Sequence, residues 1–170
     1  MMDTRLRLAG VIKESIVDGP GWRFVVFSQG CPHHCEGCHN PQTHDPDGGY
    51  ETTVGNIINE VKKNPLLKGI TLSGGDPFWQ APAFSVLAKK AHELGLDVIT
   101  YTGWTFEQIL AGLETHEGWR ELLTESDWLV DGRFILQQKT LNLPFRGSKN
   151  QRIINVKASL EEDRVIEAEL

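Results

Sequence analysis

The sequence lacks several features that would point to a membrane, an export route or nucleic acid. No stretch of eighteen consecutive apolar residues exists, and the first residues, Met1 to Arg5, have no apolar core of a signal peptide. Positive charge is not in excess, because 17 lysines and arginines face 23 aspartates and glutamates, for a formal net charge of −6. We therefore expect neither a membrane nor nucleic acid among the partners. Internal repeats and low-complexity segments are also absent.

Cysteine is scarce, and its placement is informative. The only three cysteines, Cys31, Cys35 and Cys38, lie within eight residues. An odd and clustered set does not form a disulfide framework, so we expect free thiols and a reducing cytoplasm. Three thiolates in one loop suit an iron–sulfur cluster or zinc and leave one coordination position open. Zinc stays an alternative because four histidines lie close by, at positions 33, 34, 39 and 44.

The hydrophobic pattern predicts a single α/β domain spanning residues 1–170. Short apolar runs predict strands at 24–27, 70–72, 96–101, 128–130 and 153–156, and helical stripes alternate with them at 54–61, 84–94, 106–113 and 119–123. This alternation is typical of a mainly parallel sheet with right-handed crossovers. Because a closed barrel has eight units over about 250 residues, we expect an open partial (β/α) barrel of about five to six units. The core would cover about 15–156, followed by an acidic tail at 157–170 whose last ten residues are expected to form a frayed helix.

Distinctive residues follow four of the predicted strands directly. Cys31 follows the first strand, Ser73–Pro77 the second, Thr102–Trp104 the third and Asp131–Arg133 the fourth. Ligands of α/β sheets bind beyond the carboxyl ends of the strands. The four segments are therefore expected to meet at one rim, beside the cysteines.

The ordered set of motifs resembles a known family. The spacing C-x₃-C-x₂-C directly after a strand resembles the radical S-adenosylmethionine (SAM) enzymes. Residues 15–23, Phe27, Gly30 and the end of the cysteine loop at 38–41 resemble the glycyl-radical activating branch of that superfamily, as does the stretch 72–77. Residues 128–134 and 146–151 are most similar to the activators of anaerobic ribonucleoside-triphosphate reductase.

The resemblance implies a cofactor-based site. Cys31, Cys35 and Cys38 would each bind one iron of a [4Fe–4S] cluster, and SAM would chelate the fourth iron. SAM contacts are expected from eight residues: Gly37, Cys38, His39, Ser73, Gly74, Gly75, Asp76 and Thr102. Among these, Asp76 is expected to accept from the SAM ammonium group. Many family members carry an aromatic residue where this chain has Gly37.

The same resemblance implies the reaction and the partners. SAM is reductively cleaved and hydrogen is taken from a glycine Cα of a partner protein, so no catalytic acid, base or nucleophile of the chain is required. The partner is expected to be anaerobic ribonucleotide reductase, and the electron donor a low-potential protein such as a flavodoxin. The alternatives are an activator of another glycyl-radical enzyme, similar to that of pyruvate formate-lyase, and a zinc-binding interaction module.

Overall fold

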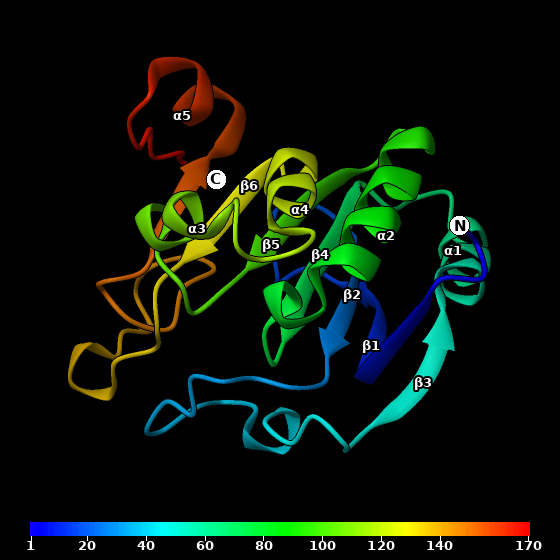
Figure 1. The fold of residues 1–170 in the computed structure, drawn as a ribbon, viewed down its shortest axis with the longest axis horizontal. Coiled ribbons are helices and arrows are strands. Elements are labelled where there is room, and N and C mark those ends of the chain that lie inside the picture. The colour runs from blue at the N-terminus through cyan, green and yellow to red at the C-terminus, as the bar shows by residue number, and fades with distance from the viewer.

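A computed structural model describes residues 1–170, which form one seven-stranded open sheet (Figure 1). The strand order is β3-β1-β2-β4-β5-β6-β7. The four strands β2, β4, β5 and β6 run parallel to one another, while β1 and β7 pair antiparallel to the two ends of this block. The bounds of the strands are Arg5–Ser15 (β1), Arg23–Ser28 (β2), Tyr50–Thr53 (β3), Gly69–Gly74 (β4), Asp97–Tyr101 (β5), Trp128–Asp131 (β6) and Arg152–Asn155 (β7).

Four of the five helices lie in the connections between the parallel strands, and the fifth follows β7; buried residues of all five belong to the core on one face of the sheet (Figure 1). Their bounds are Val54–Lys62 (α1), Ala81–Glu93 (α2), Phe106–Gly112 (α3), Trp119–Glu125 (α4) and Val156–Glu162 (α5). A main core of 26 buried residues fills the space between the sheet and these helices. A smaller cluster of Ile99, Val130 and Ile153 lies apart from this core. It belongs to alternate positions of β5, β6 and β7, so we place it on the opposite face of the sheet.

The elements predicted from the apolar pattern are present, with ends that follow local chemistry. Thr53 caps α1 by accepting from the amide of Asn56. Thr105 and Gln108 form a complete capping box at α3, and Gly95 adopts a positive φ of 80° just after α2. The α/β class and an open sheet with a parallel centre are confirmed. The count of five to six barrel units stays a prediction.

Two strands and the form of the tail were not predicted correctly. β1 and β3 extend the sheet beyond β2, although no strand was assigned to either segment. The end of the chain is not a frayed helix. Helix α5 ends at Asp163, which has a left-handed φ of 55°, and the chain then runs back along β7, where the Ala168 amide donates to the Ile153 carbonyl at 2.8 Å. β7 is the last strand of the sheet, so its outer edge has free backbone N–H and C=O groups. The end of the chain pairs with these groups, which a terminal helix would leave exposed.

None of the helices combines the length and the apolar character needed to cross a bilayer.

Candidate active site

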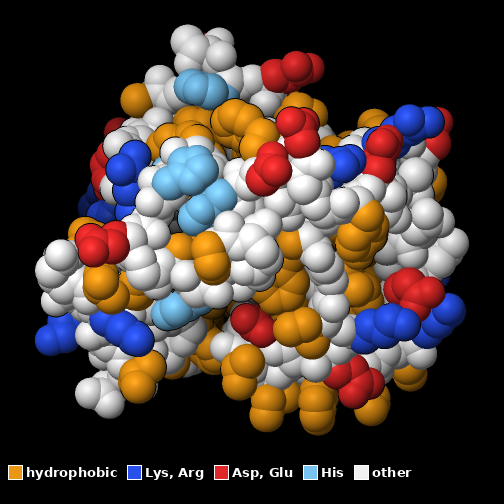
Figure 2. All heavy atoms as spheres, turned by 90° about the horizontal axis from the view of Figure 1, so that it is seen from below, with side chains coloured by type: hydrophobic (Ala, Val, Ile, Leu, Met, Phe, Trp, Pro, Cys, Tyr) orange, Lys and Arg blue, Asp and Glu red, His pale blue; other side chains and the backbone are white.

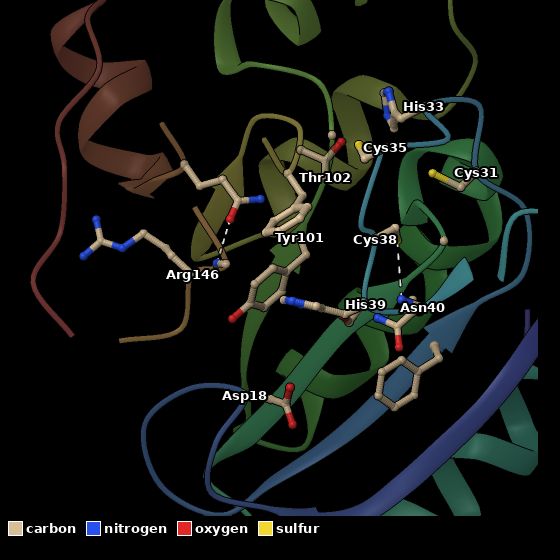
Figure 3. Close-up of a pocket in the computed structure, with 18 of the residues that line it drawn as sticks. Asp18, Cys31, His33, Cys35, Cys38, His39, Asn40, Tyr101, Thr102 and Arg146 are labelled. Carbon is tan, nitrogen blue, oxygen red and sulfur yellow. Dashed lines mark hydrogen bonds between the residues drawn. The ribbon is translucent and has the colours of Figure 1, made fainter. Parts of the chain in front are cut away.

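The carboxyl ends of the parallel strands open into a cavity of about 550 Å³ that contains all three cysteines (Figure 3). The loop after β2, the ends of β4 and β5, and the segment after β6 all contribute to its wall. In the close-up, Cys31, Cys35 and Cys38 lie at one side of the cavity and Tyr101 and Arg146 at the other. The lining residues are Ile12, Val17, Asp18, Phe27, Cys31, His33, Cys35, Cys38, His39, Asn40, Ser73, Gly74, Gly75, Tyr101, Thr102, Gly103, Gly132, Phe134, Phe145, Arg146, Gly147 and Gln151.

The cysteine loop is fastened at its base by backbone hydrogen bonds. The Gly30 amide donates to the Thr43 carbonyl at 2.6 Å, and the Cys31 amide donates to the His44 carbonyl at 3.3 Å. The buried side-chain amide of Gln29 donates to the carbonyls of Gln42 and Asp45, at 3.0 and 2.6 Å. These bonds close residues 29–45 into one loop, so the three cysteines are presented on a defined backbone.

The three thiols are free and partly buried. Burial raises the pKa of the Cys31 thiol to about 11, although the backbone amides of His33 and His34 favour the thiolate. Burial also raises the pKa of the Cys35 thiol, against the opposing effect of the Phe134 amide. The Asn40 amide donates to the Cys38 sulfur at 3.4 Å. Binding of iron must therefore displace protons from at least the first two thiols.

The three thiols line the cavity but do not converge on one common centre. Nowhere do three or more His, Cys, Asp or Glu side chains form a group that could hold a metal ion. All three thiols line one cavity, and Cys thiolates are the ligands of iron–sulfur clusters. Backbone amides near the sulfurs are a feature that tunes such clusters.

The glycines after β4 allow two backbones to approach closely. A Cβ atom on Gly74, whose φ is 92°, would lie 2.5 Å from the Ser28 nitrogen, and one on Gly75 would lie 2.3 Å from the Gly30 carbonyl oxygen. The Gly75 amide donates to the Ser28 carbonyl at 2.8 Å. These glycines are therefore required to press the end of β4 against the base of the cysteine loop.

Asp76 lies beneath the cavity wall and is fully buried. Its Oδ2 atom accepts from the Thr102 hydroxyl and the Gly103 amide, both at 2.9 Å, and lies 2.7 Å from His33 Nε2. Its Oδ1 atom accepts from the Phe78 amide at 3.0 Å. Both carboxylate oxygens are thus engaged by groups of the chain itself.

The structure brings most of the predicted site residues together. Of the predicted set, the residues that line the cavity are Cys31, Cys35, Cys38, His39, Ser73, Gly74, Gly75 and Thr102. Gly37 and Asp76 do not line it. Gly37 instead faces the segment after β6, where an added Cβ atom would meet the Leu136 side chain at 2.8 Å.

Several lining residues were not predicted. Phe134 follows the Asp131–Arg133 stretch, and its ring lies 4.9 Å from that of His39. Tyr101 ends β5, and its hydroxyl donates to the Phe145 carbonyl at 2.7 Å. Tyr101 ends the predicted strand 96–101, and ligands of α/β sheets bind beyond the carboxyl ends of the strands, so its position was an available signal. Nothing in the sequence pairs Tyr101 with a loop residue 44 positions away.

Comparison with known proteins identifies the family. A family model described as a 4Fe-4S single cluster domain matches residues 17–154. The anaerobic ribonucleoside-triphosphate reductase-activating protein of Vibrio cholerae is 37% identical over 146 residues, covering 81% of this chain and 90% of that protein. The proteins of the same name from Escherichia coli K12 and bacteriophage T4 are 33% and 35% identical, and the alignments cover 80% and 81% of this chain and 90% and 86% of those proteins.

These relatives are 33 to 37% identical to this chain over the aligned residues, and the alignments cover 86 to 90% of their length. The matched span contains the cysteine loop, the glycines after β4 and the Asp131 and Arg146 segments that form the cavity wall. The chain belongs to the family of the anaerobic ribonucleoside-triphosphate reductase-activating proteins.

Proposed function

We propose that this protein activates anaerobic ribonucleoside-triphosphate reductase as a radical SAM enzyme. The observation that carries the proposal is the cavity that gathers the three cysteines of one loop with the ends of β4, β5 and β6. The family membership supports the same activity. With a [4Fe–4S] cluster and SAM bound, the site supplies reductive cleavage of SAM and removal of a hydrogen from a glycine Cα of the partner.

Cys31, Cys35 and Cys38 are the proposed ligands of the cluster. They are the only cysteines of the chain, and all three line the cavity. Their thiol chemistry and the amides near their sulfurs fit an iron–sulfur group. Two histidines of the loop are poor candidates for a fourth ligand, because His33 is engaged by Asp76 and the His39 ring lies against Phe134.

The wall beside the cysteines, at the end of β4, is the proposed SAM site. Ser73, Gly74 and Gly75 present backbone and a small side chain to the cavity, which lets a ligand approach closely. Thr102 and His39 line the same space, and Gly37 leaves the turn before Cys38 free of a side chain. These contacts orient SAM beside the cluster and exclude water from the reacting bond.

Asp76 is proposed as a positioning residue. Its carboxylate holds Thr102, Gly103 and His33 together, so it links the ends of β4 and β5 to the cysteine loop. A direct contact with the SAM ammonium group would require Asp76 to release these groups. Its effect on SAM is therefore expected to pass through the residues that it holds.

The substrate is a glycine backbone in the partner protein. The net charge of −6 supports a protein partner rather than nucleic acid. We further propose that a low-potential protein such as a flavodoxin donates the electron, and that the protein works in the cytoplasm, because its three thiols are free. We also propose that residues 1–170 act as one domain, with the open sheet as a partial barrel.

The test is anaerobic reconstitution with iron and sulfide, followed by metal analysis and electron paramagnetic resonance. The proposal predicts about four irons per chain, a cluster signal after reduction, and 5′-deoxyadenosine when SAM and a reductant are added. Zinc without iron, or a cluster that leaves SAM intact, would contradict it.

A further inference from the structure

The outer edge of β1 is only half paired. β3 pairs with Arg5–Leu8 and extends no further along β1. Residues 9–14 make no backbone hydrogen bond other than those with β2 on their inner edge. An unpaired strand edge presents a row of N–H and C=O groups that can accept a further strand. Ile12, the one residue of β1 that lines the cavity, lies in this open half of the edge.

Exposed apolar side chains lie on this edge and directly after it. Ile12, on β1, is 43% exposed, while Ile16 and Val17, in the segment that follows β1, are 62% and 73% exposed. Ile12 and Val17 also line the cavity, so the apolar edge and the cavity are continuous. Figure 2, which views the molecule from below the view of Figure 1, shows hydrophobic side chains gathered along one margin of that face. Exposed apolar groups that adjoin a site are typical of a docking surface.

Two exposed charged residues, Lys13 and Glu14, lie on the open half of the edge, and both are paired with residues on the α1 side. Natural sheets usually block a free edge with charged side chains, lysine above all. Here the Lys13 ammonium pairs with the Glu60 carboxylate of α1 at 3.1 Å, and the Asn64 side chain donates to Glu14 at 2.8 Å. Both charges are therefore drawn toward α1 and the segment after it, which leaves the cavity side of the edge apolar.

We propose that this edge of β1, with Ile12 on the strand and Ile16 and Val17 directly after it, receives an extended glycine-containing segment of the partner protein as an added strand. The proposal rests on the proposed function, since the occupant is the segment whose glycine is activated. Strand addition holds a chain by its backbone, so it suits a segment whose key residue has no side chain. Alternate residues of an added strand point to the same face, which places the glycine Cα toward the cavity where Ile12 lies.

Binding to the reductase tests the surface without touching the cavity. Ile16 does not line the cavity, and Ile16→Asp places a charge on the docking surface. Leu66→Asp is the matched control, because Leu66 is 73% exposed and lies between α1 and β4, outside the cavity lining. The expected result is at least a tenfold weaker affinity for Ile16→Asp and less than a twofold change for Leu66→Asp. Equal affinities of the two variants would overturn the proposal.

Hydrogen exchange tests strand addition itself. When the reductase is bound, amides in residues 9–14 are expected to exchange at least several-fold more slowly, while those of β7 stay unchanged. A stable complex without new protection at 9–14 would contradict an added strand. A β1 edge occupied by a second copy of this chain would instead appear as a dimer that Ile16→Asp dissociates, with unchanged affinity for the reductase.

These results are separable from the proposed function. Binding and exchange need no SAM turnover, so they report on docking even if wild-type protein forms no 5′-deoxyadenosine. If SAM is cleaved and Ile16→Asp does not weaken binding to the reductase, the proposed docking surface is wrong and the proposed activity still stands.

Discussion

His33 Nε2 lies 2.7 Å from Asp76 Oδ2, and both side chains are almost completely buried. His33 belongs to the cysteine loop, between Cys31 and Cys35, whereas Asp76 follows β4. The contact therefore joins the loop that carries the thiols to the end of the central sheet. The His33 ring also meets the edge of Trp104, with ring centroids 4.5 Å apart. The cysteine loop is thus held in place by contacts of His33 with Asp76 and Trp104.

Replacing Asp76 separates a positioning role from a direct SAM contact. Asp76→Asn keeps the size and shape of the side chain but replaces one carboxylate oxygen by an NH₂ group. That group cannot accept the hydrogen bonds that the carboxylate receives. We expect the free energy of unfolding to fall by about 1–3 kcal/mol, measured by urea denaturation, together with weaker SAM binding. Asp47→Asn, at an exposed position of the same region, is the control and should be neutral. Weaker SAM binding at unchanged stability would identify Asp76 as a direct ligand instead.

The ligand assignment predicts a sharp contrast within one loop. Alanine at Cys31, Cys35 or Cys38 should abolish the cluster absorbance and the bound iron, because each thiol is proposed to hold one iron. Alanine at His34, an exposed neighbour of Cys35, should retain both. Iron and sulfide analysis after reconstitution distinguishes the two groups. Loss of the metal in the His34 variant would favour a mixed cysteine and histidine zinc site.

The backbone of Gly75 lies so close to that of Gly30 that adding one methyl group at Gly75 is expected to lower the stability of the fold strongly. Gly75→Ala would place a Cβ atom 2.3 Å from the Gly30 carbonyl oxygen, and backbone there does not move cheaply. We expect a loss of about 2 kcal/mol or more in stability and reduced cluster loading. Gly10→Ala is the control, since its added Cβ atom has no neighbour within 4 Å. Similar melting temperatures for the two variants would refute the steric argument.

A histidine far from the cavity predicts the pH dependence of stability. His92 lies 2.7 Å from the Glu125 carboxylate and 2.8 Å from that of Asp127. The hydrogen bond to Asp127 raises the pKa of His92 to about 9, against the opposing effect of burial. The bond to Glu125 acts in the same direction. The histidine is therefore charged at neutral pH in the folded chain.

A raised histidine pKa stabilises the fold fully below the unfolded value of about 6.5. The contribution is then lost as the pH rises to about 9. Because the His92 side chain is 32% exposed, solvent screening reduces it to about 1 kcal/mol. Urea denaturation between pH 6 and pH 10 should show this loss, and His92→Gln should flatten the profile. An identical pH profile for the variant would rule out the histidine as its source.

The sequence was sufficient for the parallel core and for part of the residues that line the cavity. Strands such as β4 are short, apolar and followed by distinctive residues, so both their type and their common rim are predictable. β1 was missed although Leu6 and Leu8 alternate with Arg5 and Arg7, because the alternation stops at Ala9 and Gly10. A broken pattern over so few residues is not distinguishable from a loop.

Long-range partners account for the remaining differences. Arg23 is fully buried because its guanidinium reaches the Asp97 carboxylate at 2.5 Å and the Thr71 hydroxyl at 2.8 Å. Asp76 is buried for the same kind of reason. Charged residues are rarely buried without such partners, and a single sequence does not reveal which distant groups will meet them.

The measurement that tests the central claim most directly is glycyl-radical formation on the partner. Reconstituted protein, SAM and a reductant are mixed anaerobically with purified anaerobic ribonucleoside-triphosphate reductase, and the electron paramagnetic resonance spectrum and 5′-deoxyadenosine are recorded. The account predicts a glycyl-radical signal on the reductase, with 5′-deoxyadenosine formed alongside it, and neither product with the Cys35→Ala variant. A reductase that acquires no radical while SAM is cleaved, or a pyruvate formate-lyase that acquires it instead, would contradict the account.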